Sequence, residues 1–211
     1  MKREEKNALS RQRILDAAMR EFSEKGYESA SLNTVCQEYG ISKGIIYHYF
    51  KDKDALYLLC AEKCFSAVTA YLQETAKRLS GTVEQRLQAY FDARLRFFAD
   101  NPLYLGIFAD AAFNPPAALS AEIAECRREF DALNISVLTE LLNSRPLREG
   151  LSVTAIVEDF RIYMDFFNLR FKASFGGKCP LETALKEHEE RCHRQLDILL
   201  HGVLGEKDGK Q

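Results

Sequence analysis

Apolar residues recur three or four positions apart along most of the chain, which is the spacing of helices with one buried face. Over residues 10–25 this spacing predicts a helix with Ile14, Ala18 and Phe22 inward, ended by Gly26. The same spacing, interrupted at glycine and proline, predicts further helices over residues 52–79, 83–99, 103–113, 117–143, 153–174 and 181–204. The pattern therefore favours an all-α chain.

Two shorter helices are predicted between residues 31 and 50. Ser31 is suited to cap the first, and Gly40 is suited to end it because glycine accepts a positive φ. Ser42 is suited to cap the second, where Ile46 and Phe50 stand four apart and share one inner side. Two helices joined by so tight a turn form a helix-turn-helix, the unit that lays its second helix in the DNA major groove.

The outer arc of the second short helix carries Lys43, Gly44, Tyr47 and His48. A cation, a phenol and an imidazole suit phosphates and base edges. Gly44 inside a helix costs about 1 kcal/mol relative to alanine. Close approach of a nucleic-acid backbone is the simplest reason to keep glycine there.

Residues 10–56 resemble the DNA-binding domain of the tetracycline-repressor (TetR) family of bacterial regulators. The resemblance rests on an ordered run of residues: Arg13–Ala18, Phe22, Gly26–Tyr27, Ser31, Val35, Gly40–Gly44, Tyr47, Tyr49–Phe50, Lys51, Lys53 and Leu56. Cys36 departs mildly, since family members usually carry alanine there, but a small thiol still packs. The run covers about a quarter of the chain, and the remainder carries no motif of comparable specificity.

The resemblance implies a ligand-responsive regulator, most simply a repressor, that binds a palindromic operator as a dimer and is released by a small molecule. It implies an N-terminal arm and three-helix module at 1–51, a helical effector-binding and dimerisation domain at 52–204, and a flexible tail at 205–211. The residues expected to contact DNA are Ser31, Asn33, Ser42, Lys43, Gly44, Ile45, Tyr47, His48, Tyr49, Lys51 and Lys53.

Two more sites are expected in the C-terminal domain. The last two predicted helices are the best candidates for a dimer interface, because the helix over 153–174 has apolar residues on more than one side and the last helix carries a long apolar stripe. The interface is expected to include Phe166, Leu169, Leu185, His188, Cys192, Leu196 and Leu199. The alternative is that this apolar surface belongs to one larger core. By analogy with the family, some aromatic residues of the middle helices line a pocket for an apolar or aromatic effector: Tyr90, Phe98, Tyr104, Phe108, Phe130, Tyr163 and Phe167. The charged Arg94 is expected there too, where it could meet a polar group of the ligand. Taken singly, each of these aromatics is more simply read as core.

Composition narrows these predictions. The net charge of the 211 residues is only −2, so DNA binding must depend on a few placed contacts rather than on bulk charge. The basic start of the chain lacks a signal peptide's apolar segment, and no long uninterrupted apolar run predicts a transmembrane helix, so a cytoplasmic protein without membrane contact and with reduced thiols is expected.

Other kinds of site were weighed. No phosphate-binding loop, nucleophile elbow or zinc-protease motif occurs in the sequence, so we expect neither an enzyme nor a cofactor. Two pairs four apart, Cys60 with Cys64 and His188 with Cys192, leave open a thiol- or metal-responsive regulator on the same fold. Cys179 is the thiol expected to be most exposed. A helical interaction module without DNA binding is the other alternative.

Overall fold

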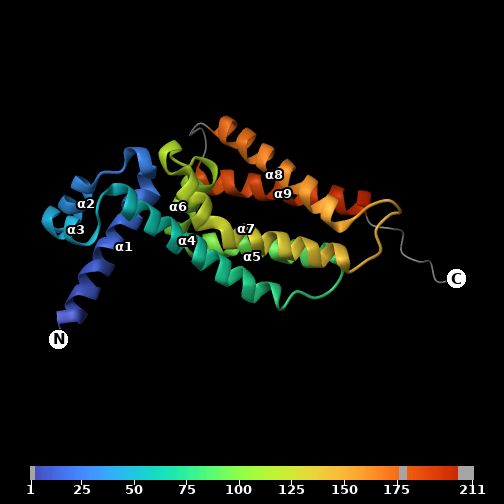
Figure 1. Cartoon of the computed structure of the whole chain (residues 1–211), viewed down its shortest axis with the longest axis horizontal. Helices are drawn as coiled ribbons and strands as arrows, with labels where there is room; N and C mark the ends of the chain where they lie inside the picture. The colour runs from blue at the N-terminus through green and yellow to red at the C-terminus, as the bar shows by residue number, and fades with distance from the viewer. Residues whose placement is uncertain (1–2, 176–179, 204–211) are drawn as a thin grey trace. The chain divides into compact units, whose positions relative to one another are not determined.

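The computed structural model describes residues 3–175 and 180–203, and its regular elements in these ranges are helices (Figure 1). They are α1 Arg3–Ser29, α2 Leu32–Tyr39, α3 Lys43–Tyr49, α4 Lys53–Ala76, α5 Val83–Asp100, α6 Pro102–Phe113, a 3₁₀ turn Ala117–Leu119, α7 Ser120–Asn143, α8 Val153–Phe175 and α9 Leu181–Val203. The all-α prediction is confirmed. Cys179 and the predicted tail lie outside the described residues.

Local chemistry sets the ends of the two short helices as predicted. The hydroxyl of Ser31 accepts from the Asn33 N–H at 3.2 Å, and that of Ser42 accepts from the Ile45 N–H at 3.3 Å. Gly40 ends α2 in the left-handed region, with φ 61°. Helix α1 begins earlier than predicted, at Arg3, and is kinked rather than ended at Gly26, whose φ is 68°.

The described chain divides into two compact units. The first comprises residues 1–67 and 100–128, and the second comprises residues 68–99 and 129–211. The first unit therefore contains α1–α3, the start of α4, α6 and the start of α7. The division at 51 and 204 remains a prediction.

The core of the first unit joins the predicted stripe of α1 to α3, α4 and α6. Its fully buried side chains include Ile14, Ala18, Phe22, Ile46, Leu56, Tyr57, Phe65 and Ile107. Helix α6 packs directly on α1 at Gly106, where an added Cβ would overlap the backbone of Ser23. Glycine is therefore what lets these two backbones approach each other.

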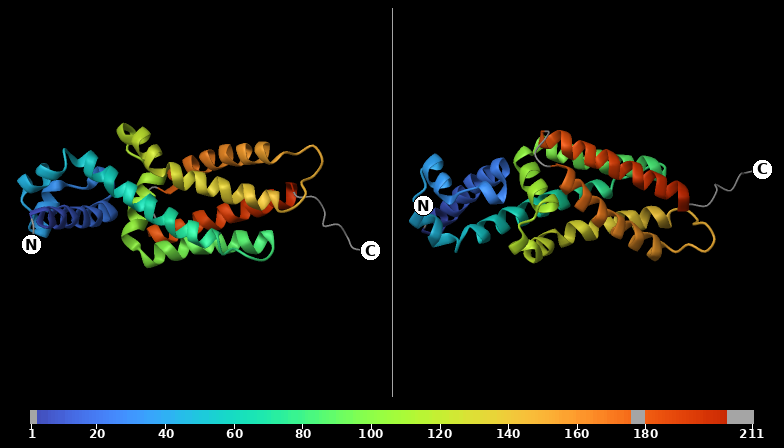
Figure 2. Two further views of the ribbon diagram at one scale, coloured as in Figure 1. Left: turned by 60° about the horizontal axis from the view of Figure 1, so that its bottom comes forward. Right: turned by 90° about the horizontal axis from the view of Figure 1, so that it is seen from above.

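The second unit corrects the predicted dimer interface. Leu185, His188, Cys192 and Leu196 on α9 are each at most 5% exposed within a single chain, because this stripe packs in the unit's own core. Leu199 is half-buried. In contrast, Phe166 and Leu169 on α8 are 62% and 64% exposed. Helix α8 also contacts α9 (Figure 2).

Helix α4 is long and apolar enough to cross a membrane by length and composition. Its apolar positions are not consecutive, so no uninterrupted apolar run marks it in the sequence. Leu56, Cys60, Cys64, Val68 and Leu72, which follow one another along one side of the helix, are all completely buried, and Leu59 is half-buried. That burial is what the core helix of a globular protein shows.

Candidate nucleic-acid interface

Helix α3 has one buried side and one exposed side. Ile46 is 0% exposed and Phe50, the C-cap, is 6% exposed, so these two residues anchor the helix. Ile45 and Tyr47 are 45% and 49% exposed although they flank Ile46. Lys43, Gly44 and His48 share this open side. The structure therefore gathers the predicted DNA-contacting residues of α3 on one surface.

Gly44 has no structural reason to be glycine within the protein itself. A Cβ at this position would meet no heavy atom of the described chain within 4 Å, and its φ is not positive. Neither packing nor backbone strain therefore explains its lower helix propensity. The missing side chain leaves open space on this surface, into which a partner outside the chain could pack closely.

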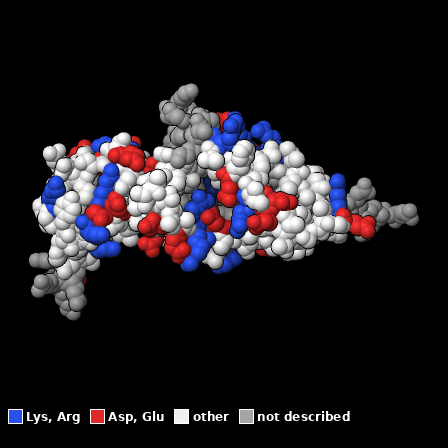
Figure 3. All heavy atoms as spheres, turned by 45° about the horizontal axis from the view of Figure 1, so that its top comes forward, with Lys and Arg blue, Asp and Glu red and all other residues white. Residues whose placement is uncertain are grey.

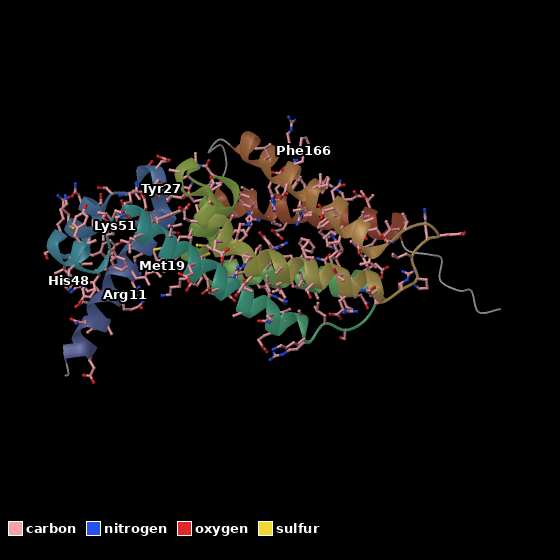
Figure 4. All side chains as sticks on the ribbon, viewed as in Figure 1. Arg11, Met19, Tyr27, His48, Lys51 and Phe166 are labelled. Atoms are coloured by element: carbon pink, nitrogen blue, oxygen red, sulfur yellow. The ribbon has the colours of Figure 1, made fainter. Side chains whose placement is uncertain are left out.

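Basic side chains flank this surface without forming a continuous basic field. His48, Lys51 and Arg11 lie in the same part of the first unit (Figure 4). The Lys43 ammonium lies 6.0 Å from the Tyr47 ring, and the Arg11 guanidinium 5.5 Å from the Phe50 ring. On the face drawn in Figure 3, basic and acidic side chains are interspersed. Placed contacts rather than bulk charge must carry recognition.

Two predicted DNA contacts are partly engaged inside the chain. The Tyr49 hydroxyl donates to the Asn7 side-chain carbonyl of α1 at 3.1 Å, and its ring packs edge-on against His48. The Lys53 ammonium donates to the Glu28 carbonyl at 3.4 Å and lies 4.4 Å from the Tyr27 ring. Both residues therefore orient the helices, whereas Lys51 is exposed.

Helix α1 braces both ends of α2 through residues that the sequence analysis did not identify. The Ser31 N–H donates to Glu21 at 2.9 Å, and Glu21 is only 2% exposed and paired with Lys25 at 2.9 Å. At the other end, Arg13 donates to the Tyr39 carbonyl at 2.9 Å. Glu21 stands beside the buried Phe22 in the sequence, which could have marked it as a buried carboxylate that needs a partner. The sequence could not show that this partner is the backbone N–H of Ser31, ten residues away.

Comparisons with known proteins agree on this module. A family profile described as bacterial regulatory proteins of the tetR family matches residues 14–60. The transcriptional regulator BetI of Escherichia coli is 26% identical over 202 residues, covering 90% of this chain and 96% of BetI. The chain is a transcriptional regulator whose residues 14–60 form a DNA-binding domain of the TetR family.

One further relative matches only the DNA-binding module, and two solved structures match most of the chain. The transcriptional repressor Rv1474c of Mycobacterium tuberculosis is 45% identical over 56 residues, which are 26% of this chain and 30% of that protein. A TetR-family regulator from Cytophaga hutchinsonii superposes with a TM-score of 0.64 at 18% identity, covering 96% and 98% of the two chains. FadR from Bacillus subtilis, solved with stearoyl-CoA, superposes with a TM-score of 0.61 at 19% identity, over 86% and 96%. The resemblance seen in the sequence and the helix-turn-helix assignment are confirmed.

The predicted effector-pocket residues fall into both units. Tyr104 and Phe108 belong to the first unit, where Phe108 packs on Phe65 with ring centroids 5.6 Å apart. The second unit holds the other predicted members, Tyr90, Arg94, Phe98, Phe130, Tyr163 and Phe167. Phe98 and Phe130 are buried in the core, while Tyr163 and Phe167 are half-buried and stack along α8 at 6.0 Å. Tyr104 is half-buried as well, so Tyr163 and Phe167 are the half-buried predicted members of the second unit and Tyr104 is that of the first.

A buried polar cluster of the second unit surrounds Arg94. The guanidinium donates to Glu189 at 2.7 Å, and its other end lies 3.5 Å from the Asn134 carbonyl oxygen. His188 lies 3.4 Å from Glu189 and 2.8 Å from the Asn168 carbonyl oxygen, with the Phe167 ring beside it. Burial opposes ionisation of Glu189, but the charge of Arg94 outweighs it and holds the pKa of this carboxyl below its usual value.

Breaking the Arg94–Glu189 pair is expected to destabilise the protein strongly. Glu189→Gln leaves the Arg94 charge buried without its counter-charge, which costs about 3–5 kcal/mol. Glu187→Gln is the control, because Glu187 pairs with Arg191 on the exposed side of the same helix, where such a pair contributes about 0–1 kcal/mol. Urea unfolding followed by circular dichroism measures both variants. Equal losses would show that Arg94 and Glu189 behave as a surface pair.

The metal and thiol alternatives find no support in the described part of the chain. No group of three or more His, Cys, Asp or Glu side chains is placed there to hold a metal ion. Burial raises the pKa of the Cys60 thiol to about 12, and it raises the pKa values of Cys64 and Cys192 as well. These three thiols therefore lack the low pKa of a reactive cysteine.

Proposed function

We propose that the protein is a repressor that binds a palindromic operator as a dimer and is released by a small molecule bound in its C-terminal domain. The observation that carries the DNA-binding part is the outer side of α3, with Gly44 in open space between exposed Lys43 and Ile45. This side carries polar groups that would not be buried in a protein core. Without a side chain at Gly44, it can approach the floor of a major groove closely.

Each exposed residue receives a role from its chemistry. Lys43 donates to a base edge, and Ile45 contacts a thymine methyl group. Tyr47, His48 and Lys51 hold phosphates, as do the hydroxyl, amide and N–H groups of Ser31 and Asn33. The N-cap Ser42 fixes where α3 begins, and Tyr49 and Lys53 set its orientation from within.

The second subunit is proposed to dock on the outer side of α8. Ile162, Phe166 and Leu169 stand three or four positions apart and are each at least 60% exposed, whereas Ile156 on the same helix is buried. Figure 4 shows Phe166 on this helix. Charged Glu158 flanks this stripe as a polar rim. A two-fold dimer places two α3 helices in successive major grooves, about 34–36 Å apart.

The effector is proposed to be an apolar or aromatic molecule bound in the second unit. The half-buried Tyr163 and Phe167 offer it ring faces, and the polar cluster of Arg94, His188 and Glu189 lies beside Phe167. FadR of similar fold was solved with stearoyl-CoA, a ligand with a long apolar chain. To release the operator, the ligand must prefer the non-binding conformation by several kcal/mol. We place the protein in the cytoplasm, where its operator would be.

The test is binding of the purified protein to labelled DNA from upstream of its own gene, followed by fluorescence anisotropy at two salt concentrations. We expect tight binding that falls steeply with salt and exceeds binding to a scrambled fragment of equal length. Equal binding to both fragments would contradict an operator at this site. No binding to either fragment at low salt would instead favour a helical interaction module.

A further inference from the structure

Asp110 on α6 connects three helices of the first unit. One oxygen of its carboxylate accepts from the Tyr27 backbone N–H of α1 at 2.9 Å and from the Tyr57 hydroxyl of α4 at 2.7 Å. Tyr57 is completely buried, so its hydroxyl needs this acceptor. An apolar side chain at position 110 would leave two donors without the partner that they have here.

The α1 kink is shaped to receive this carboxylate. Gly26 breaks the helical conformation with φ 68°, and a Cβ there would come within 2.9 Å of the other Asp110 oxygen. Four positions before Asp110, Gly106 lies against the backbone of Ser23. Two glycines, one on each helix, thus bring α6 and α1 close enough for the Asp110–Tyr27 hydrogen bond.

Tyr27 extends the connection to the start of α4. Its hydroxyl donates to Asp54 at 2.5 Å, a bond that raises the pKa of Tyr27 to about 12, and its ring lies 4.4 Å from the Lys53 ammonium (Figure 4). Lys53 and Asp54 form the first turn of α4, three residues after the Phe50 cap of α3. The residue that Asp110 holds therefore also holds the segment that leaves the recognition helix.

We propose that Asp110 is a positioning residue for DNA binding, which ties α6 to the α1 kink and to the start of α4 and thereby sets the orientation of α3. This inference rests on the DNA-binding function proposed above.

Three variants test the proposal. Asp110→Ala removes the acceptor, whereas Asp110→Asn keeps one carbonyl oxygen for both donors without the charge. Ile107→Ala is the stability control, since Ile107 is fully buried on the same helix but belongs to none of these hydrogen bonds. Two properties are measured well below the unfolding temperature: affinity for the upstream DNA fragment, and hydrogen exchange of the Tyr27 amide by NMR.

We expect Asp110→Ala to weaken DNA binding by about 2- to 30-fold and to speed exchange at Tyr27, while Asp110→Asn restores both. If Ile107→Ala weakened DNA binding as much, Asp110 would act only through the general stability of the protein, and the proposal would be overturned. Wild-type affinity in Asp110→Ala would overturn it too. If the wild-type protein binds no DNA fragment, the proposed DNA-binding function is wrong. Independently of that result, unchanged hydrogen exchange at the Tyr27 amide in Asp110→Ala would show that Asp110 does not hold Tyr27. Should Asp110→Ala not fold, Tyr57→Phe removes one of the two bonds at nearly constant volume. It must bind DNA more weakly than wild type, and wild-type affinity in Tyr57→Phe would overturn the proposal.

Discussion

Gly44→Ala is expected to abolish tight operator binding while leaving the protein fully folded. The new methyl group meets no described atom of the protein within 4 Å, so it projects from the outer side of α3. Against a closely packed partner, an extra methyl costs about 1–3 kcal/mol at each half-site. Two half-sites lose about 2–6 kcal/mol, which is roughly a 30-fold to 20,000-fold drop in affinity. Anisotropy with the upstream fragment measures it.

The control for this variant lies in the same chain. Gly202 on α9 is also a helical glycine whose Cβ would meet nothing within 4 Å in the described structure. Both alanine variants should unfold at or above the wild-type temperature, because alanine favours the helix by up to about 1 kcal/mol. Only Gly44→Ala should lose affinity for the DNA fragment. If it bound as tightly as Gly202→Ala, the surface of α3 would not be what approaches the DNA.

The double change Phe166→Glu and Leu169→Glu is expected to dissociate the dimer and, as a consequence, to abolish tight binding to the operator. A dimer on this side of α8 would have to bury four carboxylates without partners, each at a cost of several kcal/mol. A lone subunit can occupy only one half-site, so its affinity should fall towards the non-specific level, about 10³-fold or more below the dimer. Sedimentation velocity and anisotropy follow the two effects.

Tyr71→Glu provides the comparison for this variant. Tyr71 on α4 is 38% exposed and stands outside the α8 stripe, so a glutamate there adds charge without entering the proposed interface. It should remain a dimer and keep its operator affinity. A double variant that still sediments as a dimer would move the interface elsewhere, and Ile198 on α9, 57% exposed, would be the next residue to test.

Much of the helix-turn-helix follows from the sequence because its signals are local. Caps such as Ser31 and Ser42 act within three residues, and Gly40 acts at its own φ, so each can be recognised without knowing the fold. Ile46 is buried while Ile45 and Tyr47 are exposed, as the helical period requires. The outer residues of α3 were predictable for the same reason.

The apolar stripe of α9 shows what the local sequence pattern cannot predict, namely the neighbour against which an apolar face packs. The 3.6-residue period correctly placed Leu185, Cys192 and Leu196 on one face. It says nothing about which neighbour that face packs against, since a core and a partner subunit select the same apolar side chains. The structure buries this face within one chain and leaves Phe166 and Leu169 exposed on α8 instead.

The all-α class, the approximate positions of the helices and the outer surface of α3 can be predicted from the sequence alone, because helical period, caps and turn glycines act over a few residues. The contacts through which Glu21 and Arg13 of α1 hold α2, and through which Asp110 joins α6 to Tyr27 and Tyr57, appear only in the folded chain. These bonds join groups between 10 and 83 residues apart, and a backbone N–H or carbonyl is often one of the two partners. Backbone groups are the same at every position, so nothing in the sequence marks them as partners until the chain is folded.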